Sequence, residues 1–100
     1  MKAMILNKIS SLKTNRQPLV LVDIPIPEPR PNEVPIKVSV CGVCHTELDE
    51  IEGRTSPPKL PVVPGPQVVG TIVKLGSDTV NLKLGDRVGV AWIFSACGQC

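Results

Sequence analysis

Proline and glycine are spread so densely along this chain of 100 residues that long helices are excluded. It contains eleven prolines and eight glycines. Proline lacks a backbone donor and glycine favours turns, so both residues interrupt helices and separate short strands. Pro25, Pro27, Pro29 and Pro31 alternate with other residues and hold their segment extended, as a spacer rather than as a ligand for a proline-binding module. We therefore predict short strands joined by turns.

Five apolar stretches rich in β-branched residues are the expected strands. They are Lys2–Leu6, Leu19–Ile24, Val34–Cys41, Val68–Leu75 and Val88–Trp92. The third stretch alternates apolar and polar residues from Val34 to Val40, which is the period-two pattern of a half-buried strand. Gly70 is expected at a bulge or a close backbone approach, and Trp92 in the core or at its rim. The strands are too closely spaced for βαβ units, so the pattern predicts a mainly β, partly open barrel.

One short helix is expected between the third and fourth strands. Thr46 can cap it, Glu52 ends it, and Gly53 can close it in a left-handed turn. Leu48 and Ile51 are expected to face inward. The acidic side chains along this helix are most simply a solvated face: Glu47, Asp49, Glu50 and Glu52.

Charge and hydropathy exclude several classes of function. The formal net charge is +2, and the eleven basic residues are scattered singly, which argues against nucleic-acid binding. The apolar run Ala3–Leu6 is too short for a signal peptide, and the uncharged run Val88–Cys100 is too short to span a bilayer. We expect one small, soluble domain over residues 1–100, located in the cytoplasm, without a membrane partner.

The four cysteines form two C-x-x-C pairs, Cys41/Cys44 and Cys97/Cys100. Without a secretory signal, such pairs are expected as thiols or metal ligands. The second pair stands at the carboxyl end, so the domain is expected to be incomplete there. Cys41 is expected as a buried small hydrophobe. A redox dithiol at Cys41/Cys44 and one zinc knuckle made from all four thiols remain alternatives.

Four segments in order carry a family resemblance: Cys41–Glu47, Pro64–Gly70, Gly85–Val90 and Cys97–Cys100. Through them nearly the whole chain resembles the amino-terminal, GroES-like catalytic domain of zinc-dependent medium-chain alcohol dehydrogenases. The resemblance implies a GroES-like partly open β-barrel, truncated before the Rossmann domain that binds the nucleotide. It also implies oxidation of an alcohol to an aldehyde or ketone with NAD or NADP and a catalytic zinc.

The resemblance also implies roles for individual residues. Cys44 matches the thiolate ligand of the catalytic zinc, and His45 matches a residue near the cofactor pyrophosphate. Thr46 matches the hydroxyl that bonds the substrate oxygen and starts a proton relay. Glu47 stands where the family usually has an aspartate that orients a zinc-bound histidine. A catalytic zinc needs about three protein ligands and one open position.

Other positions match the family only in part. Cys97 and Cys100 match the first two of four thiolates in a structural zinc site. The family's Gly-His-Glu segment is replaced here by glycine, Pro66 and Gln67. Pro66, at the second ligand position, has no side-chain donor. Asp49, the third candidate catalytic residue beside Thr46 and Glu47, stands where many members have a relay histidine.

From these departures we expect zinc to be weakly bound or absent and this stretch to be inactive by itself. Its substrates in the family context would be alcohols or aldehydes. A catalytically silent remnant and a small zinc- or protein-binding module remain the alternative functions. Apolar surface left uncovered at the carboxyl end would favour self-association.

Overall fold

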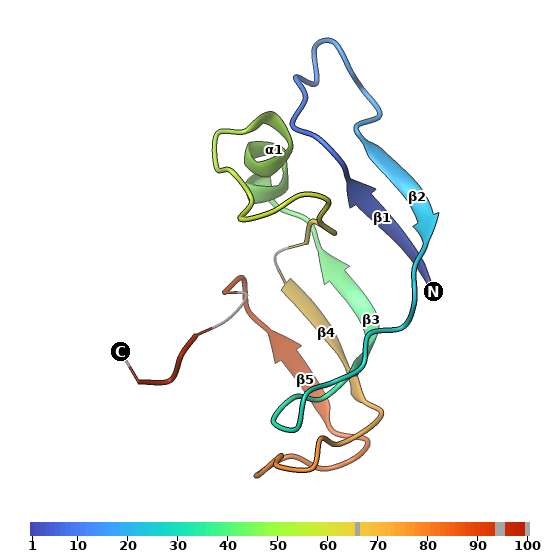
Figure 1. The fold of residues 1–100 in the computed structure, drawn as a ribbon, viewed down its shortest axis with the longest axis vertical. Coiled ribbons are helices and arrows are strands. Elements are labelled where there is room, and N and C mark those ends of the chain that lie inside the picture. The colour runs from blue at the N-terminus through green and yellow to red at the C-terminus, as the bar shows by residue number, and fades with distance from the viewer. Residues whose placement is uncertain (66, 94–95, 100) are drawn as a thin grey trace. The chain divides into compact units, whose positions relative to one another are not determined.

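The computed structural model describes residues 1–65, 67–93 and 96–99, and it is mainly β (Figure 1). In chain order the elements are β1 (Lys2–Leu6), β2 (Leu19–Asp23), β3 (Ile36–Gly42), α1 (His45–Glu52), β4 (Gln67–Ile72) and β5 (Arg87–Val90). The strands form two antiparallel sheets, β1-β2 and β3-β4-β5. The expectation of a mainly β fold with a single short helix is confirmed.

The chain divides into two compact units. One comprises Met1–Ile26 with Val43–Pro66, and the other comprises Pro27–Gly42 with Gln67–Cys100. The first unit therefore contains β1, β2 and α1, and the second contains β3, β4 and β5. The residues expected around the catalytic zinc, Cys44 to Glu47, belong to the first unit.

The first unit is organised around Leu6, whose side chain is fully buried. Strands β1 and β2 pair from Lys2 opposite Asp23 to Leu6 opposite Leu19. On the other side of β1, Leu6 exchanges two backbone hydrogen bonds with Val62, at 2.8 and 3.1 Å. Ile51 on α1 is also buried, and its carbonyl accepts from the amide of Ser10 at 2.9 Å. The helix is thus tied to the loop that follows β1.

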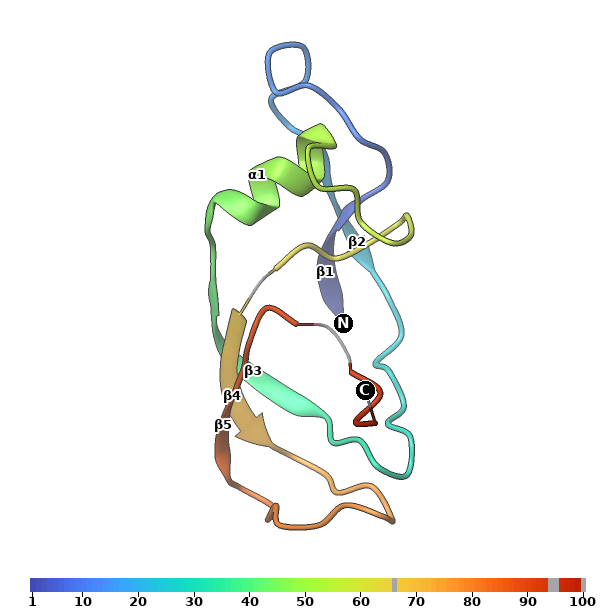
Figure 2. The same ribbon diagram turned by 90° about the vertical axis from the view of Figure 1, so that its left-hand side faces the viewer.

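The second unit places β4 between β3 and β5 (Figures 1 and 2). The register of β3 on β4 shifts between Val38 and Val40, which is a β-bulge. Beside it, Gly70 lets the strands approach closely, because an added Cβ would lie 2.4 Å from the carbonyl oxygen of Lys37. The close backbone approach expected at Gly70 as one of two alternatives is confirmed, while the bulge lies in β3, opposite Gly70. Ile72, at the end of β4, is 1% exposed.

The prediction of one buried, alternating face on β3 is wrong. Val38 and Val40 are 53% and 58% exposed. Every residue of β3 after Ile36 is exposed, so neither face of the strand is covered, and the bulge between Val38 and Val40 interrupts the period-two alternation. Trp92 is also exposed, at 71%, against the expectation of a core or rim position. Strand β5 ends at Val90, two residues too early to carry Trp92 within the sheet.

A tight turn leads into β5, as the sequence predicts. Gly85 has a φ of 86°, the left-handed region that glycine enters without steric cost. The amide of Asp86 donates to the carbonyl of Lys83 at 3.1 Å, and a carboxylate oxygen of Asp86 accepts from the amide of Lys83 at 2.9 Å. Within the described part of the chain, no helix has the length and apolar character needed to cross a membrane.

Candidate functional site

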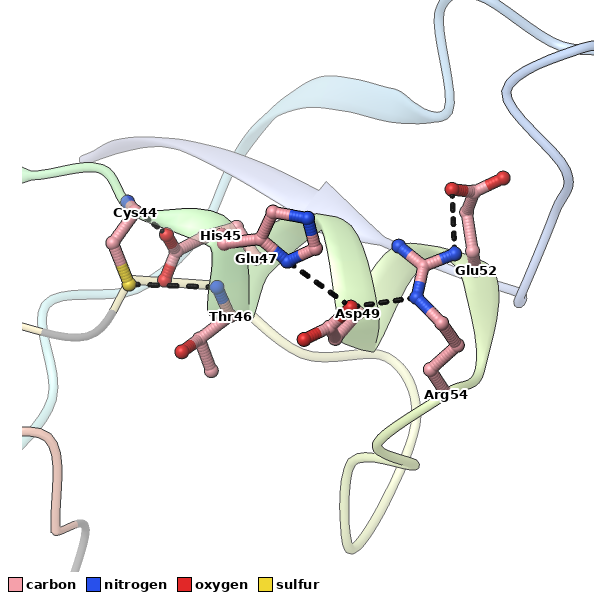
Figure 3. Close-up of polar contacts among 7 residues, drawn as sticks. All are labelled: Cys44, His45, Thr46, Glu47, Asp49, Glu52 and Arg54. Carbon is pink, nitrogen blue, oxygen red and sulfur yellow. Dashed lines mark hydrogen bonds and ion pairs between the residues drawn. The ribbon is translucent and has the colours of Figure 1, made fainter.

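Cys44 forms the amino-terminal cap of α1. Its backbone is extended, with φ −136° and ψ −174°, and its Sγ accepts from the amide of Thr46 at 3.4 Å. In return, Oε2 of Glu47 accepts from the amide of Cys44 at 2.6 Å, which completes a capping box (Figure 3). The prediction that Thr46 caps the helix is therefore wrong, because the chain becomes helical one residue before it. Gly53, with a φ of 80°, closes the helix as expected.

Glu47 is buried rather than solvated. Its side chain is 8% exposed, and its Oε1 has no hydrogen-bond partner among the described residues. Glu47 and Ile51 are four residues apart and lie on the same helix face, which is the face that is buried. Leu48 lies further round the helix and is 40% exposed, so the prediction that it faces inward is wrong. The acidic side chains of α1 that are partly exposed are therefore Asp49, Glu50 and Glu52, and Glu47 is not one of them.

A second set of contacts runs along the outer side of α1. Nδ1 of His45 lies 3.3 Å from Oδ1 of Asp49, and Nε of Arg54 lies 2.6 Å from the same oxygen. Nη1 of Arg54 also lies 3.0 Å from Oε1 of Glu52 (Figure 3). Arg54 follows the closing glycine, so its charge is placed near the carboxyl end of the helix, where a cation is favourable.

These contacts determine the ionisation of the acidic side chains on α1. The hydrogen bond from Arg54 holds the pKa of Asp49 below its ordinary value of 3.8, and His45 adds to this effect. Arg54 likewise lowers the pKa of Glu52, helped by the amide of Leu12. Burial raises the pKa of Glu50, and the charge of Glu47 adds to that rise.

The Arg54→Ala variant tests this network through the pH dependence of stability. A carboxyl group whose pKa is lowered in the folded state stabilises it above the unfolded pKa, and that stabilisation disappears as the pH falls through the folded pKa. The unfolded values are close to 3.8 for Asp49 and 4.5 for Glu52. We therefore expect the parent protein to melt above Arg54→Ala at neutral pH and the two melting temperatures to converge well below pH 4. Thermal melts from pH 2 to 7 measure this, and a difference that persists unchanged at pH 2 would contradict it.

The other cysteines are placed as follows. Cys41, near the end of β3, is exposed, so the prediction of a buried hydrophobe is wrong. Cys41 lies in the part of β3, from Lys37 to Gly42, in which every residue is exposed, so no face of the strand is buried there. Cys97 is exposed in the second unit, and its Sγ accepts from the amide of Gln99 at 3.4 Å. Cys100 and Pro66 lie outside the described residues.

The residues present do not fit a catalytic zinc. Cys44 offers one sulfur, and proline at position 66 has no side-chain atom with which to bind a metal. Throughout the described ranges, three or more histidine, cysteine, aspartate or glutamate side chains nowhere come close enough together to hold a metal ion. No step of a mechanism can therefore be assigned to zinc held by these residues.

The structure brings some of the expected site residues into contact and shows one further residue, Arg54, bonded to Asp49. The cap joins Cys44, Thr46 and Glu47, while a separate contact joins His45 to Asp49. Sequence analysis missed Arg54. The signal that could have found it is a cation directly after the helix-closing glycine and five residues after an aspartate.

The mainly β fold with one short helix is that of a GroES-like domain. A family model, the alcohol dehydrogenase GroES-like domain, matches residues 30–100. The chain is 46% identical over 85 residues to an alcohol dehydrogenase of Rhizobium meliloti, which covers 84% of this chain. It therefore belongs to the alcohol dehydrogenase GroES-like domain family.

Solved structures agree with this assignment. An NAD-dependent alcohol dehydrogenase superimposes with a TM-score of 0.81 at 27% identity, covering all of this chain and 28% of that one. The Escherichia coli quinone oxidoreductase complexed with NADPH also gives a TM-score of 0.81, at 25% identity, covering 92% of this chain and 27% of that one. The chain spans 25–28% of the length of the alcohol dehydrogenases that it matches.

Proposed function

We propose that this chain is the amino-terminal catalytic-domain part of an alcohol dehydrogenase that interconverts alcohols with aldehydes or ketones using NAD or NADP. We also propose that residues 1–100, one incomplete GroES-like domain, neither bind zinc tightly nor oxidise alcohols by themselves. The observation that carries the proposal is the Cys44–Thr46–Glu47 cap, which keeps the family's site residues together at the start of α1. We also propose that the protein is located in the cytoplasm.

Each site residue has a task in this proposal. Thr46 supplies the hydroxyl that would bond the substrate oxygen and pass its proton on. Cys44 supplies the one thiolate of the catalytic set, and Glu47 fixes the backbone at Cys44 through a 2.6 Å hydrogen bond. Cys44 would be one protein ligand of a catalytic zinc, and a zinc held by a complete ligand set would supply the Lewis acidity that acidifies a bound alcohol. Cys97 and Cys100 supply half of a structural zinc site.

Incomplete ligand sets account for the weak metal binding in the proposal. A complete structural zinc site contributes about 10–16 kcal/mol, but that value requires all four ligands. Cys97 and Cys100 supply two ligands of the structural site, and Cys44 supplies one ligand of the catalytic site. Assays of alcohol oxidation with NAD and with NADP should therefore give no turnover, and turnover by this chain would contradict the proposal.

Pro66→His tests the alignment on which the site rests. The new imidazole would add a second zinc ligand to that of Cys44, so we expect zinc affinity to rise by about tenfold or more. Competition with a chromophoric chelator measures the affinity, and the absorption of bound Co²⁺ shows whether a thiolate is coordinated. Pro66→Ala, the matched control, should leave the affinity unchanged.

The double variant Pro66→His, Cys44→Ser distinguishes the alternatives. It should lose the gain in affinity if position 66 faces Cys44. A gain that survives the removal of Cys44 would count against the alignment. One full zinc in the parent protein that depends on all four cysteines would instead favour a small zinc-binding module.

A further inference from the structure

An apolar groove of about 390 Å³ lies in the first unit, beside the carboxyl-terminal half of α1. This volume is within the range of about 300–1,000 Å³ that is typical of small-molecule sites. The walls come from β1, β2, the connection between them and α1. Five apolar side chains line the groove: Met4, Leu12, Pro18, Leu19 and Ile51. Ile51 is 6% exposed and Met4 is 44% exposed, so the groove extends from a buried floor to an open rim.

Hydrogen bonds hold the connection between β1 and β2 beside the end of α1 (Figures 1 and 2). The amide of Ser10 donates to the carbonyl of Ile51 at 2.9 Å, and the amide of Leu12 donates to Oε2 of Glu52 at 3.1 Å. The groove is therefore formed without a ligand. A binding site that is already formed loses less conformational entropy when its ligand binds.

Two polar side chains, Arg16 and Gln17, also line the groove. The backbone that carries them is fixed by a turn, in which the carbonyl of Ser11 accepts from the amide of Asn15 at 2.9 Å. Oδ1 of Asn15 in turn accepts from the amide of Gln17 at 3.1 Å. Among the described residues, the side chains of Arg16 and Gln17 make no hydrogen bond or ion pair. Their donors are thus available to a ligand in the groove.

The charge of the side chains that line the groove is positive. Arg16 is the one charged residue among them, and it is exposed. Glu50 and Glu52, the acidic neighbours of Ile51 in α1, do not line the groove. Glu52 already lies 3.0 Å from Nη1 of Arg54. Arg16 therefore provides one uncompensated positive charge beside an apolar surface, and a ligand with one negative charge is complementary to it.

The donors of Arg16 and Gln17 decide which kind of anion fits. The guanidinium of arginine is planar, and its parallel N–H donors bind a carboxylate through two hydrogen bonds. The side-chain amide of Gln17 can donate a further one. A phosphate monoester carries close to two negative charges at neutral pH, which one guanidinium does not balance. A small anion such as acetate would leave the apolar side chains without a contact.

We propose that this groove is a separate binding site for an aliphatic monocarboxylate with an unbranched chain of medium length. The carboxylate pairs with Arg16 and accepts a hydrogen bond from Gln17, and the alkyl chain lies along the apolar side chains towards Ile51. The site shares no residue with the cap of α1. It is therefore independent of the proposed function, and it binds the carboxylate without a chemical reaction.

The first test compares four ligands through the ¹H–¹³C NMR signals of the methyl groups of Met4 and Ile51. Octanoate should shift both signals and bind about threefold or more tightly than hexanoate, because its longer chain removes more apolar surface from water. Hexanamide has the chain of hexanoate without its charge, and it should bind about fivefold or more weakly. Acetate should leave both signals unchanged. No response to octanoate, equal affinity for hexanoate and hexanamide, or an equal response to acetate would each overturn the proposal.

The second test uses variants of the groove. Arg16→Gln should weaken octanoate binding by about five- to tenfold, and Arg16→Lys should recover part of the loss, because lysine keeps the charge without the paired donors. Met4→Gln exchanges an apolar side chain for a polar one of similar length, and it should reduce the advantage of octanoate over hexanoate. Both positions are exposed, so the variants should fold as the parent protein does. Parent affinity in Arg16→Gln would contradict the proposal.

Lys8→Gln is the matched control for charge. Lys8 is exposed in the same connection between β1 and β2, and it does not line the groove. Its replacement removes one positive charge, as Arg16→Gln does, and leaves the groove intact. Octanoate should bind Lys8→Gln as it binds the parent protein. An equal loss in Lys8→Gln and Arg16→Gln would show that net charge alone is responsible and would overturn the site.

A third measurement distinguishes a soluble carboxylate from a lipid surface, since both can offer apolar chains beside negative charge. The protein is sedimented with vesicles of phosphatidylcholine and phosphatidylglycerol, and octanoate is titrated in parallel below the concentration at which it forms micelles. We expect octanoate to bind and the vesicles to leave the protein in the supernatant. Sedimentation with the vesicles that is lost in Arg16→Gln, together with no response to octanoate, would assign the groove to a membrane surface and overturn the proposal.

Discussion

Gly70→Ala is expected to destabilise the protein by about 3 kcal/mol, a large part of the roughly 5–15 kcal/mol available to a domain of this size. The added methyl group would lie 2.4 Å from the carbonyl oxygen of Lys37 and 2.5 Å from Cγ2 of Ile36. The carbonyl belongs to the backbone of β3 and cannot move without breaking the pairing of β3 with β4. Urea unfolding followed by Trp92 fluorescence and by circular dichroism measures the change in free energy.

Gly89→Ala is the matched control for that substitution. Gly89 lies on the neighbouring strand β5, and an added Cβ would meet only the carbonyl oxygen of Val68, at 3.9 Å. The expected change is within about 0.5 kcal/mol. Equal losses in the two variants would show that glycine flexibility, and not the close approach at Gly70, accounts for the effect.

Leu6→Ala is expected to have a comparable effect on the first unit, with a loss of about 2–5 kcal/mol. Leu6 is fully buried, and the only other buried apolar side chains among the described residues are Ile51 and Ile72. Because so few side chains are buried, the free energy lost with the Leu6 side chain is a large part of what the core contributes to stability. Leu21, on β2, is 60% exposed and serves as the comparison. Leu21→Ala should cost less than about 0.5 kcal/mol, and a similar loss in both variants would contradict the described core.

The strands were predictable because their signals are local. Runs of apolar and β-branched residues between prolines and glycines locate the five strands of the described residues, and β1 has the predicted bounds Lys2–Leu6. The faces of the strands were less predictable. The bulge between Val38 and Val40 lies opposite Gly70 on β4, a residue distant in the sequence, so alternation alone could not reveal it.

The residues of the candidate site were predicted from their types and their order in the sequence, but their contacts and burial were predicted less well. The segment Cys44–Glu47 does begin a helix, but a thiol was not considered as its cap. The burial of Glu47 follows from the face that α1 packs inward, which its mixed sequence does not specify. Arg54 was not predicted because it lies beyond the end of α1, and its contacts with Asp49 and Glu52 depend on its side chain folding back towards that helix. Whether Cys44, Cys97 and Cys100 bind metal stays a prediction.

We expect position 66 of this member of the alcohol dehydrogenase GroES-like family to bind no catalytic metal, because proline has no side-chain ligand. The most direct measurement is the zinc content of the purified protein after dialysis against a mild chelator, by inductively coupled plasma mass spectrometry. We predict less than one zinc per chain, with no change in Cys44→Ser. One equivalent of zinc per chain that is lost in Cys44→Ser would contradict this account.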